Sequence, residues 1–277
     1  MVNERVAFQG ERGAYSEMAT LQHFPNAELI PMKSFQEVFD SLKHSTANFA
    51  VVPVENSIEG SVNETYDLLL RTDLSVSGEI YQRINHCLIA NWGTNSIIKK
   101  MAYSHPQALA QCRCYLQKKQ LEPIATYDTA GSVKMIKQKK ITDGVAIASR
   151  RAAEIYDMEI LEEGIEDRKN NFTRFLVLSK IETQPTGHDK TSIIFSVKHI
   201  PGALFIIIKE FAIRNINLTR IESRPTKETP WEYNFYLDFE GHIDDETIQE
   251  VLKSIKSKTT FVRILGSYKG AEIRPSI

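Results

Sequence analysis

The sequence has few cysteines, and their spacing is neither that of a disulfide framework nor that of a zinc site. Only Cys87, Cys112 and Cys114 occur among the 277 residues, and no set of cysteines and histidines has zinc-ligand spacing. We therefore expect no metal site and a reducing, cytoplasmic location. The sequence also lacks an apolar run of the ~20 residues that a membrane helix needs, and the N-terminus lacks a signal-peptide core.

An excess of charge of either sign is missing as well. Thirty-four Lys and Arg residues stand against 35 Asp and Glu residues, which gives a net charge of -1. So small a net charge creates no overall field that would attract nucleic acid or an anionic membrane. We therefore expect neither as a partner.

A complete glycine fingerprint for a nucleotide is absent. Gly10 and Gly13 follow a short apolar run and precede a predicted helix, with Ser16 near its N-terminus. This order begins an α/β unit, and a helix N-terminus favours an anion. The glycine spacing matches neither the dinucleotide nor the P-loop pattern, so we exclude nicotinamide and ATP binding.

What the sequence does contain is a series of strand-like apolar runs that end in polar residues. Residues 49–54 suit a parallel strand that is covered on both faces. The polar residues that follow this run and two later ones are Glu55, Asn56 and Ser57, then Gln107, then Thr129 and Ser132. Because α/β folds place ligand sites at the C-terminal ends of parallel strands, these clusters predict a binding cleft.

Residues 167–178 place polar and basic side chains directly before another apolar run. Asn171, Thr173 and Arg174 stand at the entrance of a strand predicted over 175–178. Hydrogen-bonding groups and a permanent cation at the start of a rigid strand suit an anionic substrate. The alternative is an ordinary strand that starts after an Asn-rich turn.

The C-terminal third has a different organisation. Residues 182–189 contain Pro185 and Gly187 without apolar periodicity, which predicts a linker. The following strands are predicted over 191–197, 216–224, 231–240 and 261–268, and the helices over 202–213 and 244–256. The order βαββαβ is that of a ferredoxin-like domain.

Several separated motifs together resemble the prephenate dehydratase family, in its monofunctional type with a C-terminal ACT regulatory domain. The motifs lie at residues 10–16, 53–57 with 60–61, 104–107, 127–132, 171–175, 202–205 and 222–225. The resemblance extends from Val6 to Tyr268. Because Val6 begins a strand almost at once, we expect no chorismate mutase helix bundle.

The resemblance implies an α/β fold in which a two-lobed, type 2 periplasmic-binding-protein-like catalytic domain precedes the ACT domain. The expected bounds are 1–182 for the catalytic domain and 190–277 for the ACT domain. Lobe one would hold about 1–73 and 164–182, and lobe two about 74–163, with crossings near Asp73 and Glu163. The segment that contains Thr173 would then be the return crossing and face the cleft.

The implied reaction converts prephenate into phenylpyruvate, water and carbon dioxide, without a redox cofactor or a metal. Thr173 matches the family residue that donates to the leaving hydroxyl. Arg174 would bind a substrate carboxylate, or pair with Glu55 or Asp167 to fix the cleft. Glu55 is a rival proton donor if it is buried, or else a structural carboxylate.

The substrate contacts that the resemblance implies are Ser16, Asn56, Ser57, Gln107, Thr129, Ser132, Asn171 and Phe175. Some of these residues also have a purely structural explanation. Ser16, Ser57 and Ser132 stand where helix caps are expected. For the catalytic candidate Thr173, the alternative is a strand-entry threonine that bonds its own backbone. His105, which precedes a proline, is expected to be a packed histidine without a nucleophilic partner.

The ACT resemblance implies an allosteric site for L-phenylalanine, the end product. Its expected residues are Gly202, Ala203, Leu204, Asn217, Leu218, Glu222, Ser223, Arg224 and Pro225. Because the family binds phenylalanine between two ACT domains, we expect a homodimer or homotetramer. The alternatives are a helix-start glycine at Gly202 and a simple turn at Pro225.

Two competing functions remain on the sequence alone. An arogenate dehydratase would use the same cleft for a substrate with an amine in place of the ketone of prephenate. A binding protein would be either a two-lobed solute receptor or an inactive phenylalanine sensor. The absent signal peptide argues against the receptor, and the intact motif at 171–175 argues against the inactive sensor.

Overall fold

The computed structural model describes residues 4–94, 100–227 and 231–272. None of the helices in these ranges combines the length and the apolar character that a bilayer crossing requires. The chain forms two compact units, which are Met1–Thr65 with Ile80–Phe175 and Tyr66–Glu79 with Leu176–Ile277. Because each unit is built from separate stretches, the chain passes from one to the other more than once.

The first sheet has the strand order β2-β1-β3-β11-β5, with the short β4 paired to β3. Its strands are β1 (Arg5–Gln9), β2 (Glu28–Met32), β3 (Phe49–Asn56), β4 (Gly60–Ser61), β5 (Ser75–Arg83) and β11 (Phe172–Ser179). β1 is parallel to β2 and β3, and the apolar part of β3 is buried as the sequence predicts. The carboxyl end of β3 and the start of β11 therefore meet within one sheet.

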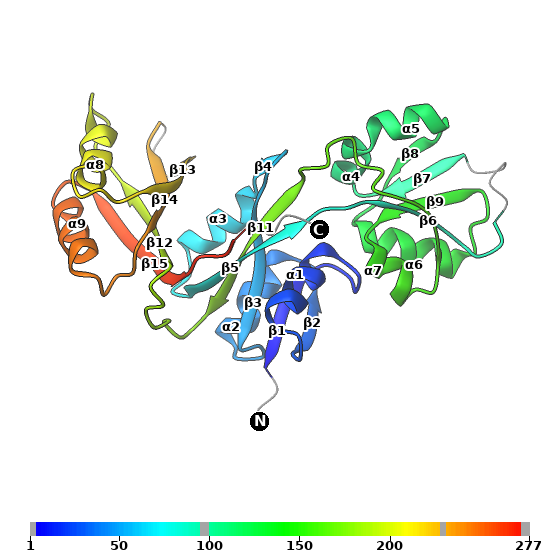
Figure 1. Cartoon of the computed structure of the whole chain (residues 1–277), viewed down its shortest axis with the longest axis horizontal. Helices are drawn as coiled ribbons and strands as arrows, with labels where there is room; N and C mark the ends of the chain where they lie inside the picture. The colour runs from blue at the N-terminus through cyan, green and yellow to red at the C-terminus, as the bar shows by residue number, and fades with distance from the viewer. Residues whose placement is uncertain (1–3, 95–99, 228–230, 273–277) are drawn as a thin grey trace. The chain divides into compact units, whose positions relative to one another are not determined.

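Three helices belong to this part of the chain: α1 (Tyr15–His23), α2 (Phe35–Lys43) and α3 (Asn63–Leu70) (Figure 1). α2 begins directly after Ser34, because Ser34 Oγ accepts a hydrogen bond from the Glu37 amide at 3.2 Å and so caps the helix. Since β5 lies in the first sheet, the chain leaves that sheet after Arg83, later than the crossing expected near Asp73. The expected domain and lobe bounds as a whole stay a prediction.

The second sheet has the order β10-β6-β9-β7-β8. Its strands are β6 (Cys87–Ala90), β7 (Met101–Ser104), β8 (Glu122–Ala125), β9 (Gly144–Ala148) and β10 (Glu159–Glu163). Its helices are α4 (Pro106–Gln111), α5 (Arg113–Lys119), α6 (Thr129–Lys139) and α7 (Arg150–Ile155) (Figure 1). β7, β8 and β9 are parallel, whereas β6 is antiparallel to both β9 and β10. α4 and α7 thus each begin just after the carboxyl end of a parallel strand, as in other α/β folds.

The third sheet lies in the second unit and has the order β13-β14-β12-β15, with all neighbouring strands antiparallel. The elements are β12 (Asp189–Ser196), α8 (Ala203–Ala212), β13 (Leu218–Pro225), β14 (Tyr233–Glu240), α9 (Glu246–Lys256) and β15 (Phe261–Lys269). Apolar side chains of the sheet and both helices form one buried cluster that includes Phe195, Phe211 and Leu237. The predicted βαββαβ order is confirmed.

The second half of α3 belongs to this second unit. The Arg220 guanidinium lies 4.7 Å from the centre of the Tyr66 ring, and Tyr236 donates a hydrogen bond to the Tyr66 carbonyl at 2.8 Å. Arg263 donates to the carbonyl oxygen of Leu70 at 2.9 Å and so satisfies the C-terminus of the helix. α3 is thereby fixed to the third sheet by contacts from three of its strands.

Glu210 joins α8 to α9 and gives this unit a testable pH dependence. Its carboxylate accepts hydrogen bonds from Lys258 at 2.5 Å, Ser254 at 2.7 Å and Arg214 at 2.8 Å, and these bonds lower the pKa of Glu210 from 4.5 to about 2. Because the folded state holds the charged form, this contribution to stability is complete above pH 4.5. We expect it to be lost as the pH falls from 4.5 toward 2.

The measurement is the urea midpoint of the full chain between pH 7 and pH 3, for wild type and Glu210→Gln. The variant should be less stable at pH 7, and the difference should shrink toward pH 3. Glu246→Gln, which removes an exposed carboxylate on α9, serves as the control. A difference that stays constant with pH would contradict the assigned role of the Glu210 charge.

Candidate active site

Asn56, the last residue of β3, lies beside the start of β11. Its side-chain nitrogen is 2.8 Å from Asn171 Oδ1, 3.0 Å from Thr173 Oγ1 and 3.2 Å from the Phe172 carbonyl oxygen. Asn56 is 5% exposed and Asn171 is fully buried, whereas Thr173 is partly exposed. Three of the residues that the sequence predicts for the site therefore form one hydrogen-bonded group, in which Thr173 is the accessible member.

The direction of these hydrogen bonds is fixed by the backbone. Asn56 Oδ1 accepts from the amides of Ile58 and Glu59, each at 3.0 Å, so the other end of this carboxamide must be the NH₂ group. Asn56 therefore donates to Thr173 Oγ1, which acts as an acceptor in this bond. The hydroxyl hydrogen of Thr173 is then left for another acceptor, such as the leaving oxygen of a substrate.

The same group continues to α4, the helix that follows β7 of the second sheet. Asn171 Nδ2 donates to Gln111 Oε1 at 2.9 Å, and His86 Nε2 lies 3.0 Å from that same oxygen. Within the described part of the chain, the Gln111 side-chain nitrogen has no hydrogen-bond partner. Gln111 therefore offers an amide donor from α4 beside the group formed by Asn56, Asn171 and Thr173.

Gln111 and His86 are not among the site residues that the sequence predicts. The predicted residue on α4 is Gln107, which lies one helical turn earlier, where its backbone amide donates to His105 Nδ1 at 3.2 Å. An i, i+4 pair of glutamines on one helix face was the available signal for Gln111. No local pattern marks His86, because it is a single histidine between two strands. His105 itself caps α4, and burial lowers its pKa.

Arg174 and Glu55 lie on the other face of the first sheet. Successive side chains of a strand point to opposite faces, so Arg174 points away from the face that Thr173 shares with Asn56. Glu55 precedes Asn56 on β3 and points away from that face for the same reason. Arg174 is 6% exposed, and Glu55 is partly buried. This placement is consistent with the alternatives in which Arg174 pairs with Glu55 or Asp167 and Glu55 is a structural carboxylate, and the roles of both residues stay predictions.

Ser57 and Phe175 support the start of β11. Ser57 is exposed, and its hydroxyl oxygen accepts from the Phe172 amide at 3.0 Å and lies 3.2 Å from the Asn170 carbonyl oxygen. Phe175 is 3% exposed and belongs to the core. Both residues thus hold the strand in place, and Ser57 is the more accessible of the two.

Ser16, Thr129 and Ser132 lie near the N-termini of α1 and α6. Ser16 donates to the Gln9 carbonyl oxygen, and Ser132 donates to the Asp128 carbonyl oxygen at 2.7 Å. The expectation that Ser16, Ser57 and Ser132 occupy cap positions is wrong. The cap positions of α1 and α6 are Ala14 and Asp128, and α3 begins only at Asn63. Thr129 is the first residue of α6 and is partly exposed.

Direct contacts connect α1 to α7 of the second sheet. Ser149 donates to the Gly13 carbonyl oxygen, and Arg151 Nε is 2.9 Å from the fully buried Glu17 carboxylate. Gly13 has a φ of +89°, and an added Cβ would lie 2.6 Å from Ala152 Cα. Glycine is therefore required here both for its backbone conformation and for the close approach of the two helices.

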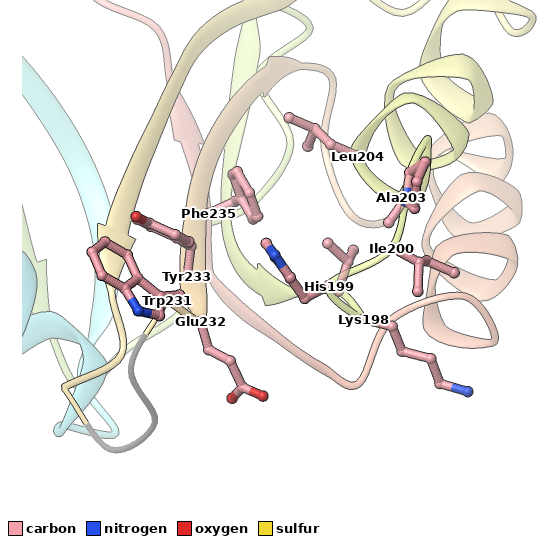
Figure 2. Close-up of a pocket in the computed structure, with 11 residues that line it drawn as sticks. Lys198, His199, Ile200, Ala203, Leu204, Trp231, Glu232, Tyr233 and Phe235 are labelled. Carbon is pink, nitrogen blue, oxygen red and sulfur yellow. The ribbon is translucent and has the colours of Figure 1, made fainter.

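A second candidate site is a pocket of about 390 Å³ in the C-terminal domain (Figure 2). Its lining consists of Val197–Pro201, Ala203, Leu204, Trp231–Tyr233 and Phe235. Figure 2 shows Ala203 and Leu204 on α8 and the aromatic side chains of Tyr233 and Phe235 on β14. The pocket thus combines an apolar lining with the N-terminus of a helix that carries no side-chain cap.

The structure brings only part of the expected phenylalanine site into this pocket. Ala203 and Leu204 line it, and Gly202 precedes them with a φ of +79°. The remaining expected residues, which do not line it, are Asn217, Leu218, Glu222, Ser223, Arg224 and Pro225. They lie on or next to β13, where Pro225 is paired with Tyr233 of the pocket. The loop before α8 and the aromatic residues at the start of β14 line the pocket but are not among the residues that the sequence predicts for it.

Arg224 has a defined partner within this domain. Its guanidinium lies 3.2 Å from the Asp67 carboxylate on α3, and Lys227 lies 2.5 Å from the other oxygen of that carboxylate. These hydrogen bonds lower the pKa of Asp67 although partial burial opposes the shift. The residues 222–225 at the end of β13 are thereby joined to α3, the helix that follows the loop after Asn56.

Comparisons with known proteins identify the family to which the two domains belong. The sequence matches the prephenate dehydratase family over residues 6–183 and the ACT domain over 191–257. It is 43% identical over 275 residues to the chloroplastic arogenate dehydratase/prephenate dehydratase 2 of Arabidopsis thaliana, covering 95% of this chain and 72% of that protein.

Two solved structures are similar over nearly the whole chain. The prephenate dehydratase of Arthrobacter aurescens in complex with L-Phe is 30% identical with a TM-score of 0.89, and the match covers 99% of this chain and 92% of that one. GqqA, described as a novel type of quorum quenching acylase, is 31% identical with a TM-score of 0.89 and coverages of 97% and 98%. The expected two-lobed α/β fold with a ferredoxin-like domain is confirmed. The chain belongs to the prephenate dehydratase family and carries a C-terminal ACT domain.

Proposed function

We propose that the group formed by Asn56, Asn171 and Thr173 carries out the decarboxylating dehydration of prephenate. The hydrogen-bond direction from Asn56 to Thr173 is the observation that supports this best, because it leaves the Thr173 hydroxyl hydrogen available. In the reaction the bond to the ring carboxylate breaks and its electrons enter the ring. The ring carbon–oxygen bond breaks at the same time, and the departing hydroxide takes up a proton to become water.

Thr173 acts on the oxygen that leaves. A hydroxyl hydrogen bond to that oxygen strengthens as negative charge develops on it, so it stabilises the transition state more than the bound substrate. Threonine is a weak acid, so the proton that completes the water comes through the hydrogen bond from solvent rather than from a lasting Thr173 alkoxide. The Gln111 amide and the neighbouring uncharged donors suit the carboxylates of the substrate without gripping the departing one strongly.

The decisive assay incubates the purified chain with prephenate or arogenate and follows the formation of phenylpyruvate or phenylalanine. We expect product from prephenate. Product from arogenate alone would assign the chain to the arogenate-specific members of the family. No product from either substrate would overturn the proposed reaction and support an inactive phenylalanine sensor.

We further propose that L-phenylalanine inhibits the enzyme through the ACT domain. The pocket at α8 offers apolar side chains for a phenyl ring, and the uncapped helix N-terminus offers amides for a carboxylate. The similarity to an enzyme in complex with L-Phe supports the same ligand. Exposed apolar side chains of α8, such as Phe205 and Ile206, support a homodimer or homotetramer in which a second copy covers this face.

Gly202→Leu should abolish inhibition by phenylalanine while turnover without phenylalanine changes little. At a φ of +79° a leucine is strained, and its side chain would enter the approach to the helix N-terminus. The coupling to be lost is about 1–3 kcal/mol, as is typical of allosteric sites. Inhibition curves measure the loss of inhibition and the turnover without phenylalanine, and calorimetric titration measures phenylalanine binding. Wild-type protein that binds no phenylalanine would refute the sensor role.

A further inference from the structure

His86 is buried between three elements that belong to different parts of the fold. It is 2% exposed and lies between β5 and β6, with its ring nitrogens directed to Gln111 on α4 and Tyr15 on α1. Its backbone amide donates to Glu166 Oε2 at 2.9 Å, which fixes the position of the residue. The Tyr15 and His86 rings meet edge to face at 5.5 Å. These hydrogen bonds and the ring contact hold the His86 side chain in one orientation.

The proton on His86 can be placed by following hydrogen-bond directions from the backbone. Asn56 donates to Asn171 Oδ1, so the other end of the Asn171 carboxamide is its NH₂ group, which donates to Gln111. The Gln111 atom that receives this bond is therefore the oxygen, and the same oxygen lies 3.0 Å from His86 Nε2. An amide oxygen only accepts, so Nε2 must carry the hydrogen.

Tyr15 holds the opposite side of the ring. Its hydroxyl donates to the Asn85 carbonyl oxygen at 2.7 Å and also lies 3.0 Å from His86 Nδ1. Burial lowers the pKa of His86, although the Gln111 hydrogen bond and the Glu166 carboxylate oppose the shift, so His86 is neutral near pH 7. In this state Nδ1 is an acceptor, and the single Tyr15 hydroxyl hydrogen is shared between Nδ1 and the nearer Asn85 carbonyl oxygen.

We infer that His86 is a positioning residue of the dehydration site, which fixes the Gln111 carboxamide with its oxygen inward and its NH₂ group available to substrate. This inference rests on the proposed function of the Thr173 group. With the hydrogen on Nδ1 instead, the Nε2 lone pair would face Gln111 Oε1 and repel it. Rotation of the carboxamide would then present an oxygen where an anionic substrate requires a donor.

The first test removes the Nε2 donor. His86→Leu should lower kcat/KM about 10–100-fold, and His86→Gln, which restores an N–H group near the Nε2 position, should recover most of that loss. Because both residues act through one amide, the double variant with Gln111→Leu should be little worse than Gln111→Leu alone. His44→Leu, which changes an exposed histidine at the C-terminal end of α2, is the control and should match wild type.

The second readout does not depend on activity. In ¹⁵N-labelled full-length protein, NMR should show His86 as the neutral form with hydrogen on Nε2. A His86 hydrogen on Nδ1, wild-type activity in His86→Leu, or additive losses in the double variant would each overturn the inference. If wild type converts neither prephenate nor arogenate, the proposed function fails, and the NMR result still decides the geometry of His86.

Discussion

Thr173→Ala is expected to lower kcat about 10²–10⁴-fold while KM changes little. The hydroxyl contributes to the step in which the carbon–oxygen bond breaks, so its loss removes an interaction that is strongest in the transition state. Binding of the intact substrate depends on the other donors and should persist. Steady-state kinetics with prephenate, on protein whose fold is checked by circular dichroism, measures both parameters.

Thr173→Ser is the matched variant, because it keeps the hydroxyl group that accepts from Asn56 Nδ2 at 3.0 Å. It should lose much less activity than the alanine variant. Near-normal turnover in pure Thr173→Ala would remove Thr173 from the mechanism. A large rise in KM with an unchanged kcat would instead assign the residue to substrate binding alone.

Asn56→Asp should lower kcat by about 10²–10³-fold although the side chain keeps its size and shape. The remaining oxygen can still accept from the amides of Ile58 and Glu59. The new carboxylate oxygen, however, faces Asn171 Oδ1 and Thr173 Oγ1 as an acceptor where both had a donor. The Thr173 hydroxyl would then donate to the introduced carboxylate and be withdrawn from the substrate.

The double variant Asn56→Asp with Thr173→Ala tests this explanation. If aspartate acts by capturing the Thr173 hydroxyl, the double variant should be little slower than the slower single variant. Losses that multiply would show that Asn56 contributes independently of Thr173. Thermal melting of each variant separates these effects from unfolding, since Asn56 is 5% exposed and a buried charge also destabilises the fold.

Local sequence patterns predicted strands such as β3 and β11 because apolar runs and the polar residues beside them report burial directly. β3 extends the predicted run 49–54 to Asn56, and β11 begins at Phe172, before the predicted run 175–178. β10 was missed because its sequence, Glu159–Glu163, is acidic and half exposed. The helical stretch that follows β7 is divided at Cys112, which ends α4 and begins α5. Such features depend on neighbouring elements rather than on local propensity.

The candidate site was predictable where its residues belong to motifs. Asn56, Asn171 and Thr173 come together, although 115 residues separate Asn56 from Asn171 along the chain. Gln111 and His86 were not predictable, because their importance arises from hydrogen bonds between elements that are distant in sequence. Whether the expected residues bind substrate stays a prediction that the kinetic variants address.

In the C-terminal domain, too, the sequence predicted the elements but not the residues that long-range packing brings together. Its element order followed from the pattern of apolar residues, and Gly202 lies at the start of α8 as expected. The pocket beside it is formed by the loop at Val197–Pro201 and by the residues from Trp231 to Phe235, which no motif marked. Loops that converge from two strands leave no periodic signal in either segment.

The attachment of α3 to the third sheet limits how this protein can be divided or recombined. A gene fragment for residues 190–277 would omit Tyr66–Glu79, which belong to the same compact unit. Tyr236 and Arg263 would lose their partners on α3, and the backbone of Val76, against which Gly266 packs, would be missing. An ACT domain exchanged between relatives at residues 182–189 would therefore meet a foreign helix and strand, so a stable exchange requires residues 66–79 as well.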